Sequence, residues 1–172
     1  MRYNLTVELM TTRQTVRRKE KEIQDIELID RIIAQSQVCR LGLCRDNLPY
    51  VVPVSFGYDG EFIYFHTASE GLKLDYIHAN PRVCFEFEHD VKVVPDDTSA
   101  CKWTVSFYSV IGFGTVSEIT DPQGKAYALN QIVRHYSGRD WEVDVRELDR
   151  PRTWRVTIDS ISGKKSKDKV GL

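Results

Sequence analysis

The chain has 172 residues, of which 41% are hydrophobic and 28% are charged, and this is enough apolar content for one globular core. Its formal net charge of −1 provides no overall basic field, which argues against a nucleic-acid partner. No apolar run approaches the roughly 20 residues of a membrane helix, and no secretory leader pattern is present. We therefore expect a cytoplasmic protein with no membrane partner, divided into an N-terminal arm (1–20), a single domain (21–163) and a basic tail (164–172).

The first elements of the domain follow from hydrophobic spacing. Residues 25–35 place isoleucine and leucine at helical intervals, which predicts an amphipathic helix. Residues 38–44 favour a short strand, followed by a turn at Arg45-Asp46-Asn47. Two further strands are predicted over 51–58 and 61–67. They are joined by Asp59-Gly60, a pair suited to a two-residue hairpin turn.

A polar turn follows this hairpin and leads into a short helix, which Asn80-Pro81 should end because a residue before proline avoids the α region. Thr67, Ser69 and Lys73 lie around the expected helix start. Free backbone N–H groups, the positive end of the helix dipole, two hydroxyls and a lysine together favour a bound phosphate. The alternative is an ordinary N-cap without a ligand.

The second half of the chain adds more strands than helices. Gly112 and Gly114 fit either a strand bent around a small barrel or the close approach of a cofactor ring. The strands arrive mostly as consecutive antiparallel pairs without βαβ alternation, so we expect a mainly β barrel with peripheral helices. The predicted elements are strands at 83–88, 104–119 and 153–161, a loop at 94–102 and a helix from Asp121-Pro122 to about residue 136.

No metal site is expected from the cysteines and histidines. The four cysteines show no CxxC pair and no zinc-type spacing with histidine. The four histidines form no HExxH arrangement. We therefore predict reduced cysteines, and histidines that carry no metal.

Four segments occur in a characteristic order: PYVVPVSFGYDG, YFHTASEGLK, NPRVCFEFE and SVIGFG. This order resembles the flavin-binding split-barrel proteins of the pyridoxamine-phosphate-oxidase-like superfamily, and within it the nitroimidazole-resistance proteins. The resemblance runs from about Arg17 to Lys164. It implies an FMN-binding split β-barrel of antiparallel strands.

The resemblance also implies which residues hold FMN. The strand at 52–55 would meet the flavin ring, the segment around His66 and Lys73 would meet the phosphate, and residues 108 and 109 would come from a partner subunit. Leu72 stands where the oxidase branch commonly places an arginine, which implies a thinner phosphate cage. The implied cofactor contacts are Val52, Pro53, Val54, Ser55, His66, Thr67, Ala68, Lys73, Tyr108 and Ser109.

Three functions are compatible with this resemblance. The first is a homodimeric FMN-dependent oxidoreductase, with flavin sites at the subunit interface, that reduces a small electron-poor compound such as a 5-nitroimidazole. His66 would then be a proton donor or substrate contact, and a nicotinamide donor could reduce the flavin transiently. The second is a pyridoxamine-phosphate-oxidase-related enzyme, although residues 162–169 lack its Arg-x-His type of pattern. The third is a non-enzymatic flavin or haem sensor or scavenger.

Overall fold

An antiparallel sheet of eight strands dominates the computed structural model, which describes residues 16–144 and 151–167. Seven strands follow the order β3-β2-β6-β7-β8-β5-β4, and β1 pairs with β8 off this path. The predicted mainly β architecture is confirmed. The strands are β1 (Glu22–Ile23), β2 (Cys39–Arg45), β3 (Leu48–Val54), β4 (Gly57–Tyr58), β5 (Phe62–Thr67), β6 (Arg82–Val94), β7 (Thr104–Ile119) and β8 (Arg152–Lys165).

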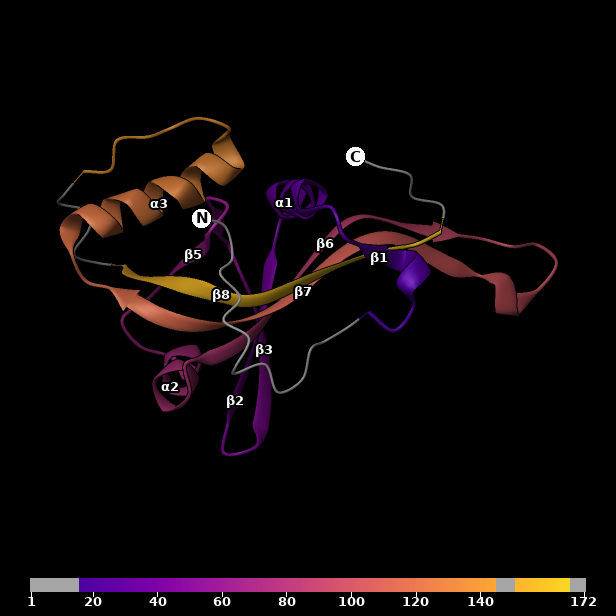
Figure 1. The fold of residues 1–172 in the computed structure, drawn as a ribbon. Helices are drawn as coiled ribbons and strands as arrows, with labels where there is room; N and C mark the ends of the chain where they lie inside the picture. The colour runs from indigo at the N-terminus through magenta and orange to yellow at the C-terminus, as the bar shows by residue number, and fades with distance from the viewer. Residues whose placement is uncertain (1–15, 145–150, 168–172) are drawn as a thin grey trace.

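Three α-helices lie around this sheet: α1 (Ile26–Gln35), α2 (Leu72–Ala79) and α3 (Pro122–Ser137). The long β7–β8 pair separates α1 and α3 on one side from α2 on the other (Figure 1). Short 3-10 turns occupy Lys19–Lys21 and Ala100–Lys102. The core is largely aromatic and branched aliphatic, and its fully buried side chains include Phe56, Phe65, Phe85, Phe87, Ile32, Ile33, Leu41, Ile63, Val110 and Val156.

Capping residues define where two of the helices begin. The carboxylate of Asp25 accepts from the N–H of Glu27 at 3.0 Å, and Asp121 accepts from the N–H of Gly124 at the start of α3. These N-caps satisfy amides that have no partner within the helix. Both helices therefore begin where the sequence predicted.

The glycines of β7 accommodate the protein's own packing. A Cβ at Gly112 would lie 2.6 Å from the carbonyl oxygen of Ser160 and would overlap the ring of Phe85. A Cβ at Gly114 would lie 2.6 Å from Cγ1 of Val156, next to a register shift in the β7–β8 pairing. The structure thus favours the bent-strand interpretation of these glycines over a cofactor approaching them.

The predicted strand over 51–58 is wrong, because the chain leaves the sheet at Ser55. β3 pairs with β2 along its whole length, whereas only Gly57 and Tyr58 pair with β5. The break follows from Phe56, which is fully buried and whose N–H donates to the Tyr136 hydroxyl at 3.2 Å instead of to a neighbouring strand.

The turn between β4 and β5 also differs from the prediction, whereas the turn between β2 and β3 lies where it was expected. The N–H of Asp59 donates to the carbonyl of Phe62 at 3.4 Å, so the turn falls at Gly60-Glu61, and Gly60 has φ 92°. The turn between β2 and β3 has positive φ at two successive residues, 51° at Asp46 and 60° at Asn47. That pattern is typical of a type I′ hairpin.

Two strands run further than their sequence patterns indicated. β6 continues past Glu88 to Val94 through a register shift between His89 and Lys92, and with β7 it forms the ribbon that projects from the molecule in Figure 1. β8 continues past Ile161 to Lys165, so the first residues of the expected basic tail belong to the sheet. The rest of that tail from 168, and residues 1–15 of the expected arm, lie outside the described residues.

Candidate functional site

The anion site is predicted at the junction between β5 and α2. α2 begins at Leu72, and Gly71 is its N-cap with φ 135° and no side-chain cap hydrogen bond. The N–H of Leu74 donates to the Gly71 carbonyl at 2.8 Å, which closes the first turn. The N-terminal end of α2 is thus shaped by a glycine backbone, and no side chain of the described residues caps its amides.

Lys73 and His66 lie at this junction without a compensating charge. Burial lowers the pKa of Lys73 below its ordinary value. The pKa of His66 is also lowered, first by partial burial and then by the positive charge of Lys73. Within the described residues neither side chain makes a hydrogen bond or an ion pair. A bound anion would therefore stabilise the protonated form of both groups.

Thr67 is engaged inside the protein. Its Oγ1 donates to the carbonyl of Ala68 at 2.8 Å and accepts from the indole Nε1 of Trp154 at 3.1 Å. The side chain is buried, whereas Ala68 and Ser69 are exposed. The hydroxyl of Thr67 therefore supports the junction from within and is not the free donor that we expected.

Sequence reasoning did not find Arg152, which stands beside Thr67 in the β5–β8 register. Its guanidinium donates to both carboxylate oxygens of Glu118, at 2.8 and 2.5 Å, and lies 4.9 Å from the Trp154 ring centroid. Its Nη2 also lies 3.3 Å from Nε2 of His78 on α2. Glu118 precedes Arg152 by 34 residues, so no local spacing could have indicated the pair.

Three of the four residues predicted to meet a flavin ring lie in β3 at one edge of the sheet, and Ser55 follows the end of that strand. β3 ends the strand order, so its outer side pairs with no strand of the described residues. Pro53, which has no N–H, therefore lies in an edge strand, where the loss of one backbone donor is tolerated. Pro53 and Ser55 are exposed, Val52 is half-buried and Val54 is buried.

Tyr108 and Ser109 lie far from the β5–α2 junction. Tyr108 is 1% exposed and belongs to the core, whereas Ser109 is half-buried. Along β8, the partner of Ser109 is Lys164 and the partner of Thr67 is Arg152. At roughly 3.3 Å per residue these positions are about 40 Å apart along the strand. One subunit therefore does not bring these two groups together.

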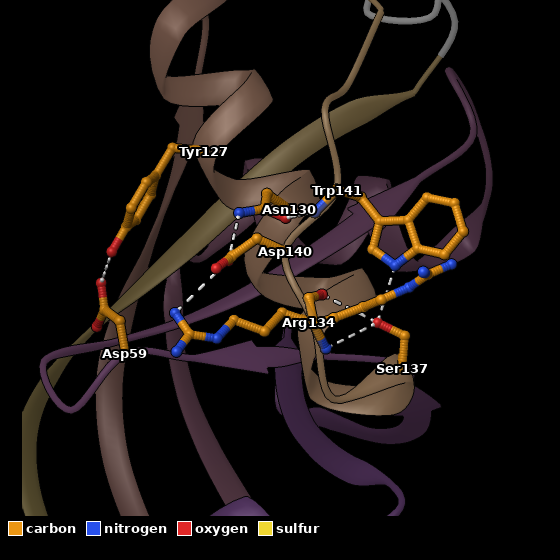
Figure 2. Close-up of polar contacts among 8 residues, drawn as sticks. Asp59, Tyr127, Asn130, Arg134, Ser137, Asp140 and Trp141 are labelled. Carbon is orange, nitrogen blue, oxygen red and sulfur yellow. Dashed lines mark hydrogen bonds and ion pairs between the residues drawn. The ribbon is translucent and has the colours of Figure 1, made fainter.

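The described residues also form a cavity of about 450 Å³, and none of the predicted cofactor contacts lines it. Tyr127 and Arg134 of α3 lie on its wall, and Tyr127 reaches Asp59 (Figure 2). The complete lining is Ala34, Tyr58, Asp59, Tyr127, Gln131, Arg134 and His135.

Neither a metal-binding cluster nor a membrane-spanning helix occurs among the described residues. No group of three or more histidine, cysteine or acidic side chains is arranged to hold a metal ion in the described part of the chain. None of the described helices has both the length and the apolarity to cross a membrane.

The pyridoxamine 5'-phosphate oxidase family model matches residues 25–165, which is most of the chain. The chain belongs to this family. A curated relative, an uncharacterised protein of Rhizobium meliloti (strain 1021), is 28% identical over 93 residues, and the match covers 54% of each chain. The aligned part thus spans about half the length of this relative.

Solved structures share the fold over nearly the whole domain. A candidate 5-nitroimidazole antibiotic resistance protein from Bacteroides thetaiotaomicron is 31% identical, with a TM-score of 0.73 and coverage of 84% of this chain and 86% of that one. A FAD and haem binding protein from Mycobacterium smegmatis is 20% identical, with a TM-score of 0.74 and coverage of 87% and 77%. A flavocytochrome from Azotobacter vinelandii is 22% identical, with a TM-score of 0.73 and coverage of 92% and 74%. The last two likenesses concern the fold alone.

Proposed function

We propose that this protein binds FMN, with the phosphate at the β5–α2 junction, and delivers electrons from it to a small electron-poor compound. The observation that carries the proposal is the pair His66 and Lys73, two nitrogen bases with lowered pKa values and no counter-charge among the described residues. The FMN phosphate is a dianion that would supply this charge, and the N-terminal end of α2 adds its dipole.

The rest of the cofactor would extend to the edge of β3. A flavin ring needs backbone hydrogen-bond groups along its polar rim and apolar walls on its faces. The outer side of β3 has backbone groups without a strand partner, and Val52 and Pro53 supply apolar surface beside them. This geometry supports the ring contacts inferred from the sequence.

A homodimer would complete the site. Because Ser109 lies about 40 Å along β8 from Thr67, a flavin at the β5–α2 junction could contact Ser109 only from a second copy. Exposed apolar residues on the β6–β7 ribbon suit such an interface: Val93 is 66% exposed, Val105 opposite it is 42% exposed, and Trp103 is 54% exposed. Light scattering should give about twice the 19.9 kDa chain mass, and Val93→Lys should reduce it.

FMN, when bound, supplies the redox chemistry, and the protein positions it and tunes its charge. The free His66 imidazole is neutral at pH 7 because its pKa is lowered. A phosphate dianion beside it would raise that pKa and favour the imidazolium, which could then donate a proton to a reduced substrate. A nicotinamide compound is the candidate electron donor.

A 5-nitroimidazole is the candidate substrate because of the Bacteroides thetaiotaomicron protein, at 31% identity and similar length. The test begins with the absorbance spectrum of the purified protein and mass spectrometry of the released chromophore. Reduced protein is then mixed anaerobically with a 5-nitroimidazole in a stopped-flow instrument. We expect flavin reoxidation to be faster than for free reduced FMN. An equal rate would contradict the nitroreductase proposal but would not affect the proposal that the protein binds flavin.

The second candidate function is a flavin or haem sensor or scavenger, in which His66 and Lys73 would help to hold the cofactor without serving a reaction. A Soret band in the same spectrum would indicate haem. The pyridoxamine-phosphate-oxidase activity itself ranks lower because residues 162–169 lack the Arg-x-His type of pattern of that branch.

A further inference from the structure

The cavity between α1, β4 and α3 is a second candidate site, independent of the proposed flavin contacts. Its volume of about 450 Å³ lies within the roughly 300–1,000 Å³ of small-molecule sites. Side chains from three separate segments meet there, including Ala34 of α1, Tyr58 of β4 and Gln131 of α3. None of its lining residues belongs to the β5–α2 junction or to the β3 edge.

The charged side chains around this cavity already have partners within the protein. The Asp59 carboxylate accepts from the Tyr64 hydroxyl at 2.8 Å and from the Tyr127 hydroxyl at 3.2 Å. Arg134 lies 3.6 Å from an oxygen of Asp140, as Figure 2 shows. The cavity is therefore suited to a ligand without net charge.

His135 adds no charge to this wall. Burial lowers the pKa of His135 below its ordinary value, so the imidazole is neutral at pH 7. Its Nε2 lies 2.8 Å from the carbonyl oxygen of Ser36, and its ring packs 4.2 Å from that of Phe56. It is a fixed, neutral part of the cavity lining.

Gln131 is the polar group that lacks a partner. The residue is only 8% exposed and lines the cavity, and its side-chain amide makes no hydrogen bond within the described part of the chain. The amide atoms keep some accessible surface in the cavity, so water or a ligand can supply the hydrogen bonds that the protein does not. The amide presents an acceptor and a donor side by side. Its complement is a ring edge that carries a donor next to an acceptor.

We propose that this cavity binds a neutral heteroaromatic ring with a lactam or carboxamide edge. Gln131 would pair with that edge, and the rings of Tyr58 and Tyr127 would provide aromatic walls. The occupant would be of nucleobase size, and it would bind whether or not a flavin is present.

The test uses 2-pyridone, a lactam with an N–H donor beside its carbonyl, and 1-methyl-2-pyridone, which lacks the donor. Ligand-observed NMR with the full chain gives the affinity for each. Gln131→Leu removes the amide, Gln131→Met does so with less change of shape, and Gln123→Leu makes the same change at an exposed position of α3. Thermal unfolding of each variant checks that it is folded.

We expect saturable binding of 2-pyridone, with about tenfold weaker binding in both Gln131 variants and for the methylated compound, as for one lost hydrogen bond. Gln123→Leu should bind like the wild type. Absence of saturable binding by the wild type would overturn the proposal, as would equal affinity for the methylated compound or full affinity in a folded Gln131 variant. Bound flavin is measured separately and should not change in these variants.

Discussion

The indole Nε1–H of Trp154 donates a 3.1 Å hydrogen bond to Oγ1 of Thr67, across neighbouring strands and within the buried core. The bond ties β8 to the last residue of β5, immediately before the proposed phosphate site. The Thr67 hydroxyl in turn donates a hydrogen bond to the carbonyl oxygen of Ala68. Thr67 therefore acts on the site by holding its backbone.

Thr67→Val should lower stability without removing flavin. The variant leaves a buried indole donor unpaired, which costs about 1–3 kcal/mol, and urea unfolding followed by tryptophan fluorescence measures this. Thr67→Ser keeps the hydroxyl and should retain most of the stability. If Thr67→Val instead loses flavin affinity while remaining as stable as the wild type, the hydroxyl contacts the phosphate directly.

Lys73→Ala should weaken FMN binding by about 1.5–3 kcal/mol, the scale of a charged hydrogen bond, or roughly tenfold to a hundredfold in Kd. Fluorescence titration of the apoprotein with FMN gives this value. Lys102→Ala, at an exposed turn, is the matched control and should bind normally. The same titration with riboflavin, which lacks phosphate, should not distinguish Lys73→Ala from the wild type. Unchanged FMN affinity in Lys73→Ala would show that the phosphate does not bind at Lys73.

The stability of the flavin-free protein should fall as the pH drops below about 6.5. Burial lowers the folded pKa values of His66 and His135 below the ordinary histidine value of about 6.5. The unfolded chain therefore binds more protons between the folded and unfolded pKa values, and stability is lost as the pH decreases through that window. Thermal unfolding at several pH values should show a shallower decline in His66→Gln. Bound FMN should also reduce the decline. If neither His66→Gln nor bound FMN changes the pH dependence of stability, His66 does not contact the phosphate.

Gly57→Ala should destabilise the fold by about 3 kcal/mol or more, because overpacking against a fixed backbone has few ways to relax. A Cβ at Gly57 would lie 2.6 Å from the backbone nitrogen of Ile132 in α3. Gly42→Ala is the control, since its Cβ would lie an ordinary 3.5 Å from Cβ of Cys84. Denaturant unfolding of both variants measures the difference, and similar stabilities would show that α3 can shift away from β4.

Thiol labelling should separate the four cysteines by burial. Cys44 and Cys101 are exposed and should react first with a disulfide reagent at pH 8. Burial raises the pKa of Cys39, which has no exposed surface, and of the partly buried Cys84, so both should react more slowly. Protein unfolded in guanidinium should give four equivalents at once. Rapid reaction of Cys39 in the native protein would indicate local opening of β2.

Local chemistry made part of this structure predictable. Asn80-Pro81 ends α2, Asp121 caps α3, and Pro53 marks an edge strand, because each effect acts within a few residues. The break after Ser55 was missed because it depends on the contact of Phe56 with Tyr136, which is 80 residues away.

The candidate site also has parts that local sequence could predict and parts that depend on distant residues. Lys73 was identified from its position at the start of a helix. The hydrogen bond between Thr67 and Trp154 was not predicted, because the two residues are 87 positions apart and meet only through β5–β8 pairing. The cavity at Gln131 was also missed, since three separate segments form it.

The position of β8 in the sheet has a consequence for how the protein is made. β8 pairs with β1, β5 and β7, and all three precede it along the chain. During synthesis those strands would therefore wait with unpaired edges until residues 152–165 leave the ribosome. A nascent chain stalled before that point would expose the edges of β5 and β7 together, and these edges could pair with other chains.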